Sequence, residues 1–381
     1  MKLARQVTGF AVLLAAIIAA IWLAQDRPAA SSRESETAAP ARERSIHPVP
    51  TRDPGDDPAG AQAAEREKIQ NDWDALILWL RAVPPPSAEE IEARLLATRI
   101  AWTTTDPQAR AEALRKLLET GEDAVTGLDF AVGNHGLLAG WPTLRVFLLD
   151  ILATSDPEMA SATARQLLDR TDSPDEYATA LRSLTRQGIA RANDSELVSR
   201  FGHMLDRPQW DQSRGFAEAL DLARVVGSAE AARKLAAWNG NPVLKAMAMD
   251  EFAAEHPQAM MEVLDGESSV TGKSRARLMA RADPADAGQL AAVDNYLRSP
   301  DRTDEEAAVF LKLFPLRSAT TGFRLYGTPP SPYTFEQIKA GDQVALDRVD
   351  AWAGDPALGK YRPHLAALQQ RLAEWVGQAE E

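Results

Sequence analysis

A short polar residue followed by proline recurs along this sequence, each time just before a stretch whose apolar residues have helical spacing. The polar side chain can cap the first free backbone N–H groups of a helix. Proline suits the first helical position because its missing N–H has no partner to lose there. The dipeptides are Asp106-Pro107, Asp156-Pro157, Ser173-Pro174, Asn241-Pro242, His256-Pro257, Asp283-Pro284 and Asp355-Pro356. Together with the lack of convincing strand patterns, they predict an all-α fold.

Other local signals place individual helices. Residues 87–90 and 334–337 carry the capping-box pattern, a Ser or Thr followed three residues later by Glu or Gln. Residues 144–152 are apolar on nearly all sides, which predicts a helix buried within its bundle. A further helical pattern ends near Val132, ahead of a Gly- and Asn-rich turn.

The spacing of the prolines indicates a repeated unit. Those at 157, 174, 208, 242 and 257 are separated by 17, 34, 34 and 15 residues, and a pair of helices takes about 34 residues. In this architecture the chain resembles bacterial tetratricopeptide-like and HEAT-like α-solenoids. The tetratricopeptide Trp-Leu-Gly-Tyr signature is missing, and the step from Pro257 to Pro284 breaks the spacing. A non-repetitive all-α domain is the alternative.

The N-terminus has the features of a membrane anchor. Residues 7–24 carry no charge and would form a helix of ~27 Å, about the thickness of the hydrocarbon core of a bilayer. Lys2 and Arg5 precede this stretch, so we expect the N-terminus inside and the rest of the chain translocated. The prediction is a single-pass protein of the cytoplasmic (inner) membrane with its bulk in the periplasm. Cleavage as a secretory signal is the alternative.

The amino-acid composition limits which partners the protein can bind and which chemistry it can perform. The chain has 381 residues, no cysteine and a net charge of −13. Without cysteine, disulfides, thiol nucleophiles and Cys-based metal sites are excluded. The acidic charge argues against nucleic acid. Thr271-Gly272-Lys273-Ser274 resembles the end of a phosphate-binding loop, but Glu267 stands where that motif needs glycine, so we expect no nucleotide.

The chain is expected to divide into five parts, each with its own composition. Residues 25–58, rich in Pro and Ala, are predicted to be a disordered linker after the anchor at 1–24. The helical-repeat domain is expected at 59–314, a long loop at 315–333, and a C-terminal helical unit packed on the repeats at 334–381.

Two groups of side chains are candidates for binding a partner, because Met and aromatic residues are frequent in binding surfaces. They are Met247, Met249, Met260, Met261, Phe323, Tyr326 and Tyr333, and Phe335 belongs to the same group of loop aromatics. For the methionines, core packing and Cu(I) ligation are alternatives. For the aromatic residues, the alternative is that the loop folds back onto the helices. No catalytic, cofactor-binding or metal-ligating residue is predicted.

These features favour a non-enzymatic function. We expect a membrane-tethered scaffold or adaptor outside the cytoplasm, which binds a protein or peptide. One alternative is a membrane-anchored all-α enzyme acting on an envelope substrate through carboxylates. Another is a steric chaperone for an exported protein, since the layout resembles bacterial lipase chaperones, although their Arg-x-x-Phe-Asp-Tyr element is missing.

Overall fold

The computed structural model describes residues 58–185, 194–265, 269–318, 322–327 and 333–378. These residues are mostly helical, with very little strand, so the all-α prediction is confirmed. The predicted membrane span at 7–24 lies outside the described residues, as does the predicted linker up to residue 57. Among the described helices, none combines the length and the apolar character that crossing a bilayer requires.

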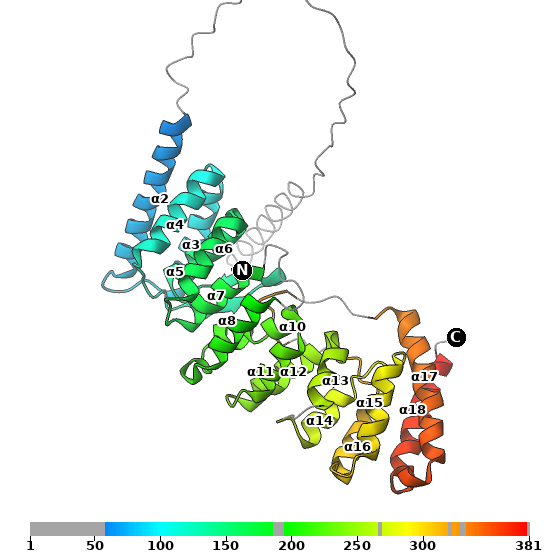
Figure 1. Ribbon diagram of the computed structural model, residues 1–381. Helices are drawn as coiled ribbons and strands as arrows, with labels where there is room; N and C mark the ends of the chain where they lie inside the picture. Colours follow the sequence, from blue (N-terminus) through cyan, green and yellow to red (C-terminus); the bar gives the residue numbers. More distant parts are fainter. Residues whose placement is uncertain (1–57, 186–193, 266–268, 319–321, 328–332, 379–381) are drawn as a thin grey trace, which may run out of the picture. The chain divides into compact units, whose positions relative to one another are not determined.

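Most of the elements follow one another with short connections, and the segment between α16 and α17 is the long exception (Figure 1). The first are α2 (Pro58–Leu80), α3 (Ala88–Thr103), α4 (Pro107–Thr120), β1 (Ala131–Val132), the 3₁₀ turn η1 (Asn134–Gly136), β2 (Leu138–Gly140), α5 (Leu144–Ser155), α6 (Pro157–Leu168) and α7 (Pro174–Thr185). Next come α8 (Ser195–Leu205), η2 (Pro208–Trp210), α9 (Arg214–Ala219), α10 (Leu222–Val226), α11 (Ala229–Ala237), α12 (Pro242–Glu255) and α13 (Pro257–Asp265). The last are α14 (Gly272–Met279), α15 (Ala287–Arg298), α16 (Asp304–Leu313), α17 (Phe335–Gly354), η3 (Pro356–Tyr361) and α18 (Arg362–Gln378).

Most predicted helix starts are correct. Both capping boxes form, at the starts of α3 and α17. Asp106, Asp156 and Asn241 each accept hydrogen bonds from the first turn of the helix that follows, with proline at its start. The start predicted at Pro284 is wrong: α15 begins at Ala287, because Asp286 caps it by accepting the Gln289 N–H at 2.9 Å.

The sequence predicts no strand near Val132, and this prediction is also wrong. Residues 131–132 pair antiparallel with residues 138–140 around η1, where a helical pattern was expected to end. Strands of two and three residues are too short to produce an alternating pattern in the sequence. By contrast, α5 is the buried helix that was predicted, since every residue from Leu144 to Ala153 is buried.

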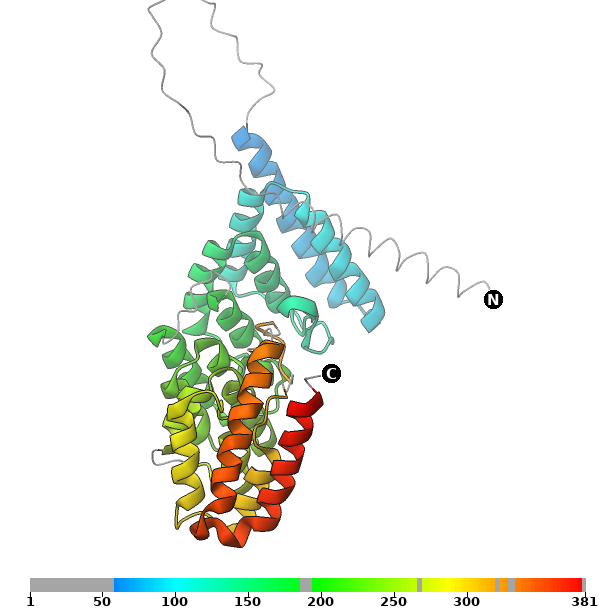
Figure 2. The same ribbon diagram turned by 90° about the vertical axis from the view of Figure 1, so that its right-hand side faces the viewer.

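Packing is local along the chain. Each α-helix packs mainly against the helices one or two places away in the sequence, so the helices line up in chain order (Figure 1). At the C-terminal end, α17 and α18 lie side by side (Figure 2), and α18 also packs against α16.

Ion pairs repeat with a fixed sequence spacing. Among the described residues, six of them join positions 31 apart, each linking one helix or its end to the second helix along the chain. They are Arg145–Glu176, Arg165–Glu196, Asp169–Arg200, Arg224–Glu255, Asp250–Arg281 and Arg275–Glu306. This spacing is three residues shorter than the unit expected from the prolines.

Candidate peptide-binding surfaces

The candidate methionines lie mostly in the core. Met249 on α12 and both Met260 and Met261 on α13 are buried between helices, and Met249 also forms part of the lining of a pocket between α12 and α14. Met247 is half-buried, and its Cε would lie 2.3 Å from a Cβ placed on Gly322. It therefore packs against the segment that contains two of the candidate aromatic residues.

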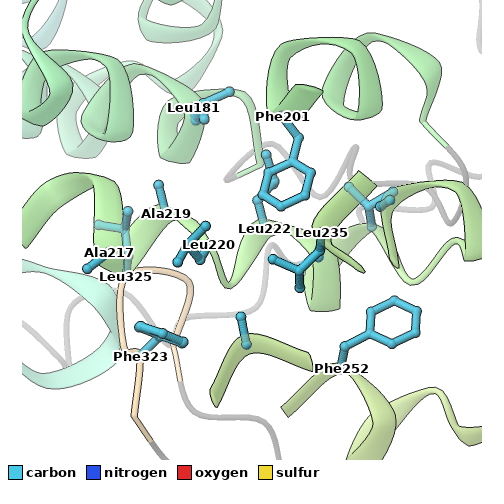
Figure 3. Packing of buried hydrophobic residues seen from close by; sticks show 14 of the residues in the cluster. Leu181, Phe201, Ala217, Ala219, Leu220, Leu222, Leu235, Phe252, Phe323 and Leu325 are labelled. Atoms are coloured by element: carbon cyan, nitrogen blue, oxygen red, sulfur yellow. The ribbon is translucent and has the colours of Figure 1, made fainter. Parts of the chain in front are cut away.

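That segment comprises residues 322–327 and will be called the inserted segment. Phe323 and Leu325 are buried, whereas Arg324 between them is exposed. Figure 3 shows the two apolar side chains reaching toward Ala217 and Leu220, which belong to α9 and its C-terminal end. The aromatic loop therefore folds back onto the helices here, and Phe323 is not available to a partner in this structure.

Side chains from helices far away in the sequence bind the backbone of the inserted segment. Glu251 Oε1 on α12 accepts hydrogen bonds from the N–H groups of Gly322 and Phe323, the latter at 3.3 Å. Glu218 Oε2 on α9 accepts the Arg324 N–H at 2.7 Å. Arg224 Nη2 on α10 donates to the Gly327 carbonyl at 3.3 Å. Carboxylates thus bind the N–H groups, and a guanidinium binds the carbonyl.

The same surface concentrates buried carboxylates. Asp221 and Arg224 form a bidentate pair with both N–O distances at 2.6 Å, and Arg224 also reaches Glu255 at 2.7 Å. Burial raises the pKa of Asp221 to about 6, although Arg224 opposes the shift. Burial likewise raises the pKa of Glu251 to about 7, against the two backbone hydrogen bonds that favour its ionised form.

On its other side the inserted segment meets η1. Gly136 has a φ of +70°, and a Cβ placed on it would lie 2.6 Å from the Leu325 carbonyl oxygen. Arg182 of α7 holds this turn by donating to the Gly136 carbonyl at 2.5 Å. The inserted segment therefore bridges the hairpin after α4 and the helices α9 to α12.

Arg182 belongs to a charge cluster in which it and Asp150 are fully buried and Arg99 is partly exposed. It pairs with Asp150 on α5, which also accepts from Arg99 at 3.0 Å and from the Trp141 indole at 3.1 Å. Burial alone would raise the pKa of Asp150, but the two arginines outweigh it and lower that pKa. Asp150 is therefore ionised and lies between the two guanidinium cations.

Two candidate tyrosines are partly covered. The Tyr326 hydroxyl is buried and has no hydrogen-bond partner among the described residues, and burial raises its pKa well above 10. Tyr333 is half-buried, and burial raises its pKa as well. The structure places Met247 against the segment that contains Phe323 and Tyr326, whereas Met260 and Met261 are buried on α13.

A separate groove of about 640 Å³ lies at the C-terminal helices, between α16, α17, α18 and the residues after α16. We call it the C-terminal groove. Its lining residues are Lys312, Leu313, Pro315, Leu316, Arg317, Ser318, Phe335, Ile338, Asp342, Arg371 and Trp375. Phe335 and Trp375 are 65% and 39% exposed, and both lie in the lining of this one groove.

The charges of the C-terminal groove are unbalanced. Arg317 pairs with Asp342, but no acidic side chain of the described residues pairs with Lys312 or Arg371. The Arg371 guanidinium lies 5.2 Å from the centroid of the Trp375 ring and donates to the Lys312 and Phe314 carbonyls. Burial lowers the pKa of Arg371 because nothing negative offsets it. The groove combines apolar surface with excess positive charge.

The sequence pointed to Phe335 of the C-terminal groove, but it did not reveal most of the other residues that build the two surfaces. In the sequence, Glu218, Glu251 and Arg224 look like ordinary charged residues of helices. Their hydrogen-bond partners in the inserted segment lie 71 to 106 positions away. Trp375 at the end of α18 carries no sequence pattern that distinguishes it from a core residue. Within the described residues, no group of three His, Cys, Asp or Glu side chains could hold a metal ion.

Comparisons with known proteins give no match to a family model, to a curated protein or to a solved structure. Function is therefore inferred from the contacts within this chain.

Proposed function

We propose that this protein is a helical-repeat scaffold that binds a segment of a protein partner in its C-terminal groove, without catalysing a reaction. The repeat architecture is supported by the local packing of the helices and by the six ion pairs with a spacing of 31 residues. Stacked helix pairs present extended surfaces for protein binding, and each unit is stabilised by its neighbours.

The observation that carries the proposal is the exposure of Phe335 and Trp375 beside the uncompensated cations Lys312 and Arg371. Aromatic side chains dominate the energetics of binding surfaces, and an exposed apolar groove with a polar rim typically binds a partner. In a chain with a net charge of −13, a groove with excess positive charge selects an occupant with a negative charge.

The proposed occupant is a peptide segment that carries apolar side chains and a carboxylate, from Asp, Glu or a free C-terminus. Its apolar side chains would cover Phe335, Ile338 and Trp375. Its carboxylate would lie near Lys312 and Arg371, where it would offset the cost of burying the guanidinium.

Site-specific photocrosslinking in living cells tests this proposal. A benzoylphenylalanine placed at Phe335 should capture one partner, and the crosslinked segment should contain apolar residues next to a carboxylate. The same group at Val243, which is 64% exposed on α12, is the matched control and should not capture that partner. Equal capture at the two positions, or none at Phe335, would contradict the proposal.

We also propose that the scaffold works outside the cytoplasm, tethered through residues 7–24. The uncharged stretch with basic residues before it supports this placement. Because the chain has no cysteine, a single Val243→Cys variant can report its own location. In intact spheroplasts a membrane-impermeant maleimide should label it, and labelling only after lysis would contradict the placement.

A further inference from the structure

The inserted segment is bound in the way that a scaffold binds a peptide from another molecule. It has no regular helix or strand, and its only internal backbone hydrogen bond among the described residues runs from the Gly327 N–H to the Arg324 carbonyl. Its other described backbone bonds go to side chains of α9, α10 and α12. Side chains that bind a peptide backbone give affinity without requiring a particular sequence.

Specificity comes from the alternation of side chains along the inserted segment. Phe323 and Leu325 are buried beside α9, and the exposed Arg324 separates them. A surface with two adjacent apolar sites selects an aromatic residue and an aliphatic residue two positions apart. Burial of two such side chains removes apolar surface from water and so favours holding the segment in place.

This contact differs from the packing of the rest of the chain. Helices elsewhere pack mainly on near neighbours, and the ion pairs of the described residues join positions at most 57 apart, whereas the inserted segment reaches side chains 71 to 106 positions away. The acceptor Glu251 is buried and forms no ion pair among the described residues, so the two N–H groups of the segment are its direct partners, and the charge of Arg224 acts on it from farther away.

We propose that α9, α10 and α12 form a second peptide-binding surface, which residues 322–327 of the same chain occupy as an internal ligand. The surface fits an extended peptide with an aromatic residue, any residue and an aliphatic residue in succession. A partner with this pattern competes with the inserted segment for Glu218, Glu251 and Arg224. This surface is distinct from the C-terminal groove and does not depend on the function proposed for it.

Peptide complementation tests the proposal in the full-length protein. In the double variant Phe323→Ala, Leu325→Ala the surface should be vacated, and a fluorescent peptide with the sequence of residues 320–328 should bind to it. The wild-type protein should bind the same peptide at least about tenfold more weakly, because its own segment competes. A peptide with serine in place of the Phe and the Leu is the control and should bind to neither protein.

The acceptor side chains supply a second control. Adding Glu251→Ala to the double variant should weaken peptide binding at least about tenfold, whereas Glu230→Ala, at an exposed carboxylate on α11, should leave it unchanged. A folded double variant that does not bind the peptide would overturn the proposal.

Hydrogen exchange of the wild-type protein keeps the proposal testable if the double variant fails to fold. An internal ligand should open without global unfolding, so the amides of Gly322, Phe323 and Arg324 should exchange faster than the buried amides of α12. Exchange of these three amides only at the global unfolding rate would show that the segment is an integral part of the core, and would overturn the proposal.

Discussion

Two buried carboxylates show how the surroundings of a residue set its charge. Asp150 is enclosed by Arg182 and Arg99, and its pKa is lowered despite complete burial. Glu251 is buried with only backbone N–H groups as partners, and its pKa rises to about 7. The two residues should therefore change the stability of the protein with pH in opposite directions.

Glu251→Gln should make the protein less sensitive to pH. The pKa of Glu251 is about 7 in the folded protein and near 4.5 when unfolded, so ionisation destabilises the folded state as the pH rises from about 4.5 through 7. Glutamine can still accept the two hydrogen bonds without a charge. We expect the variant to gain roughly 2 kcal/mol at pH 8 and little at pH 4.5. Urea unfolding across this range is the measurement.

Part of the pH dependence should remain in Glu251→Gln, because the raised pKa of Asp221 acts in the same direction. The control Glu230→Gln, at an exposed side chain, should reproduce the wild-type curve. An unchanged slope in Glu251→Gln would show that this carboxylate is not buried as described.

Asp150→Asn should be strongly destabilising at neutral pH. Removing the carboxylate leaves the charges of Arg182 and Arg99 without their partner, and breaking a buried pair typically costs about 3 to 5 kcal/mol. Because the pKa of Asp150 is lowered, its contribution is present above its unfolded pKa near 3.8 and is lost as the pH falls further. Chemical denaturation at pH 7 should show the loss, whereas the exposed Asp347→Asn should show almost none.

At the scale of elements, the sequence predicts helices well where capping and proline coincide, as at the starts of α4, α6 and α12. It fails at β1 and β2, which are two and three residues long and depend on the turn between them. It also fails to place residues 322–327, because the contacts that hold them come from helices that no local pattern connects to them. Tertiary contacts decide the conformation of such short elements.

A matched pair of glycine substitutions tests the contact between η1 and the inserted segment. Gly121 and Gly136 have φ values of +74° and +70°, so alanine should cost about 1 to 2 kcal/mol of backbone strain at either position. At Gly121 nothing lies within 4 Å of the added Cβ, whereas at Gly136 it would lie 2.6 Å from the Leu325 carbonyl oxygen. Gly136→Ala should therefore be at least about 1 kcal/mol more destabilising than Gly121→Ala.

Thermal or urea unfolding of the two alanine variants gives this difference directly. Equal losses of stability would mean that the inserted segment does not press against η1.

At the scale of the whole molecule, pairs of opposite charges indicate the repeated packing of helices, which the spacing of apolar residues does not reveal. Opposite charges recur 31 positions apart from Arg145 to Glu306, and each such pair joins a helix to the second helix along the chain.

The candidate binding surfaces could be predicted from the sequence only in part. The loop aromatics Phe323 and Tyr326 are functional candidates in the sequence, but the sequence does not show that Glu218 and Glu251 bind the backbone of their segment.

The C-terminal groove could not be predicted from the sequence, because its lining residues come from α16, α17, α18 and the residues between α16 and α17. Phe335 begins α17 and Trp375 lies near the end of α18, so 40 positions separate the two exposed aromatic residues. Only the packing of α17 on α18 brings them to one groove.

The most direct test of partner binding in the C-terminal groove is selection from a random peptide library by the full-length protein and by its Lys312→Glu variant. Wild-type protein should enrich peptides that combine aromatic or aliphatic residues with Asp, Glu or a free carboxyl terminus. Lys312→Glu should reduce the affinity of these peptides about fivefold to tenfold, since one charge-assisted contact is reversed. Lys116→Glu on α4, an exposed lysine outside the groove, should enrich the wild-type set. Enrichment of peptides without a carboxylate preference, or the same set and affinities from the Lys312→Glu variant, would contradict this function for the groove.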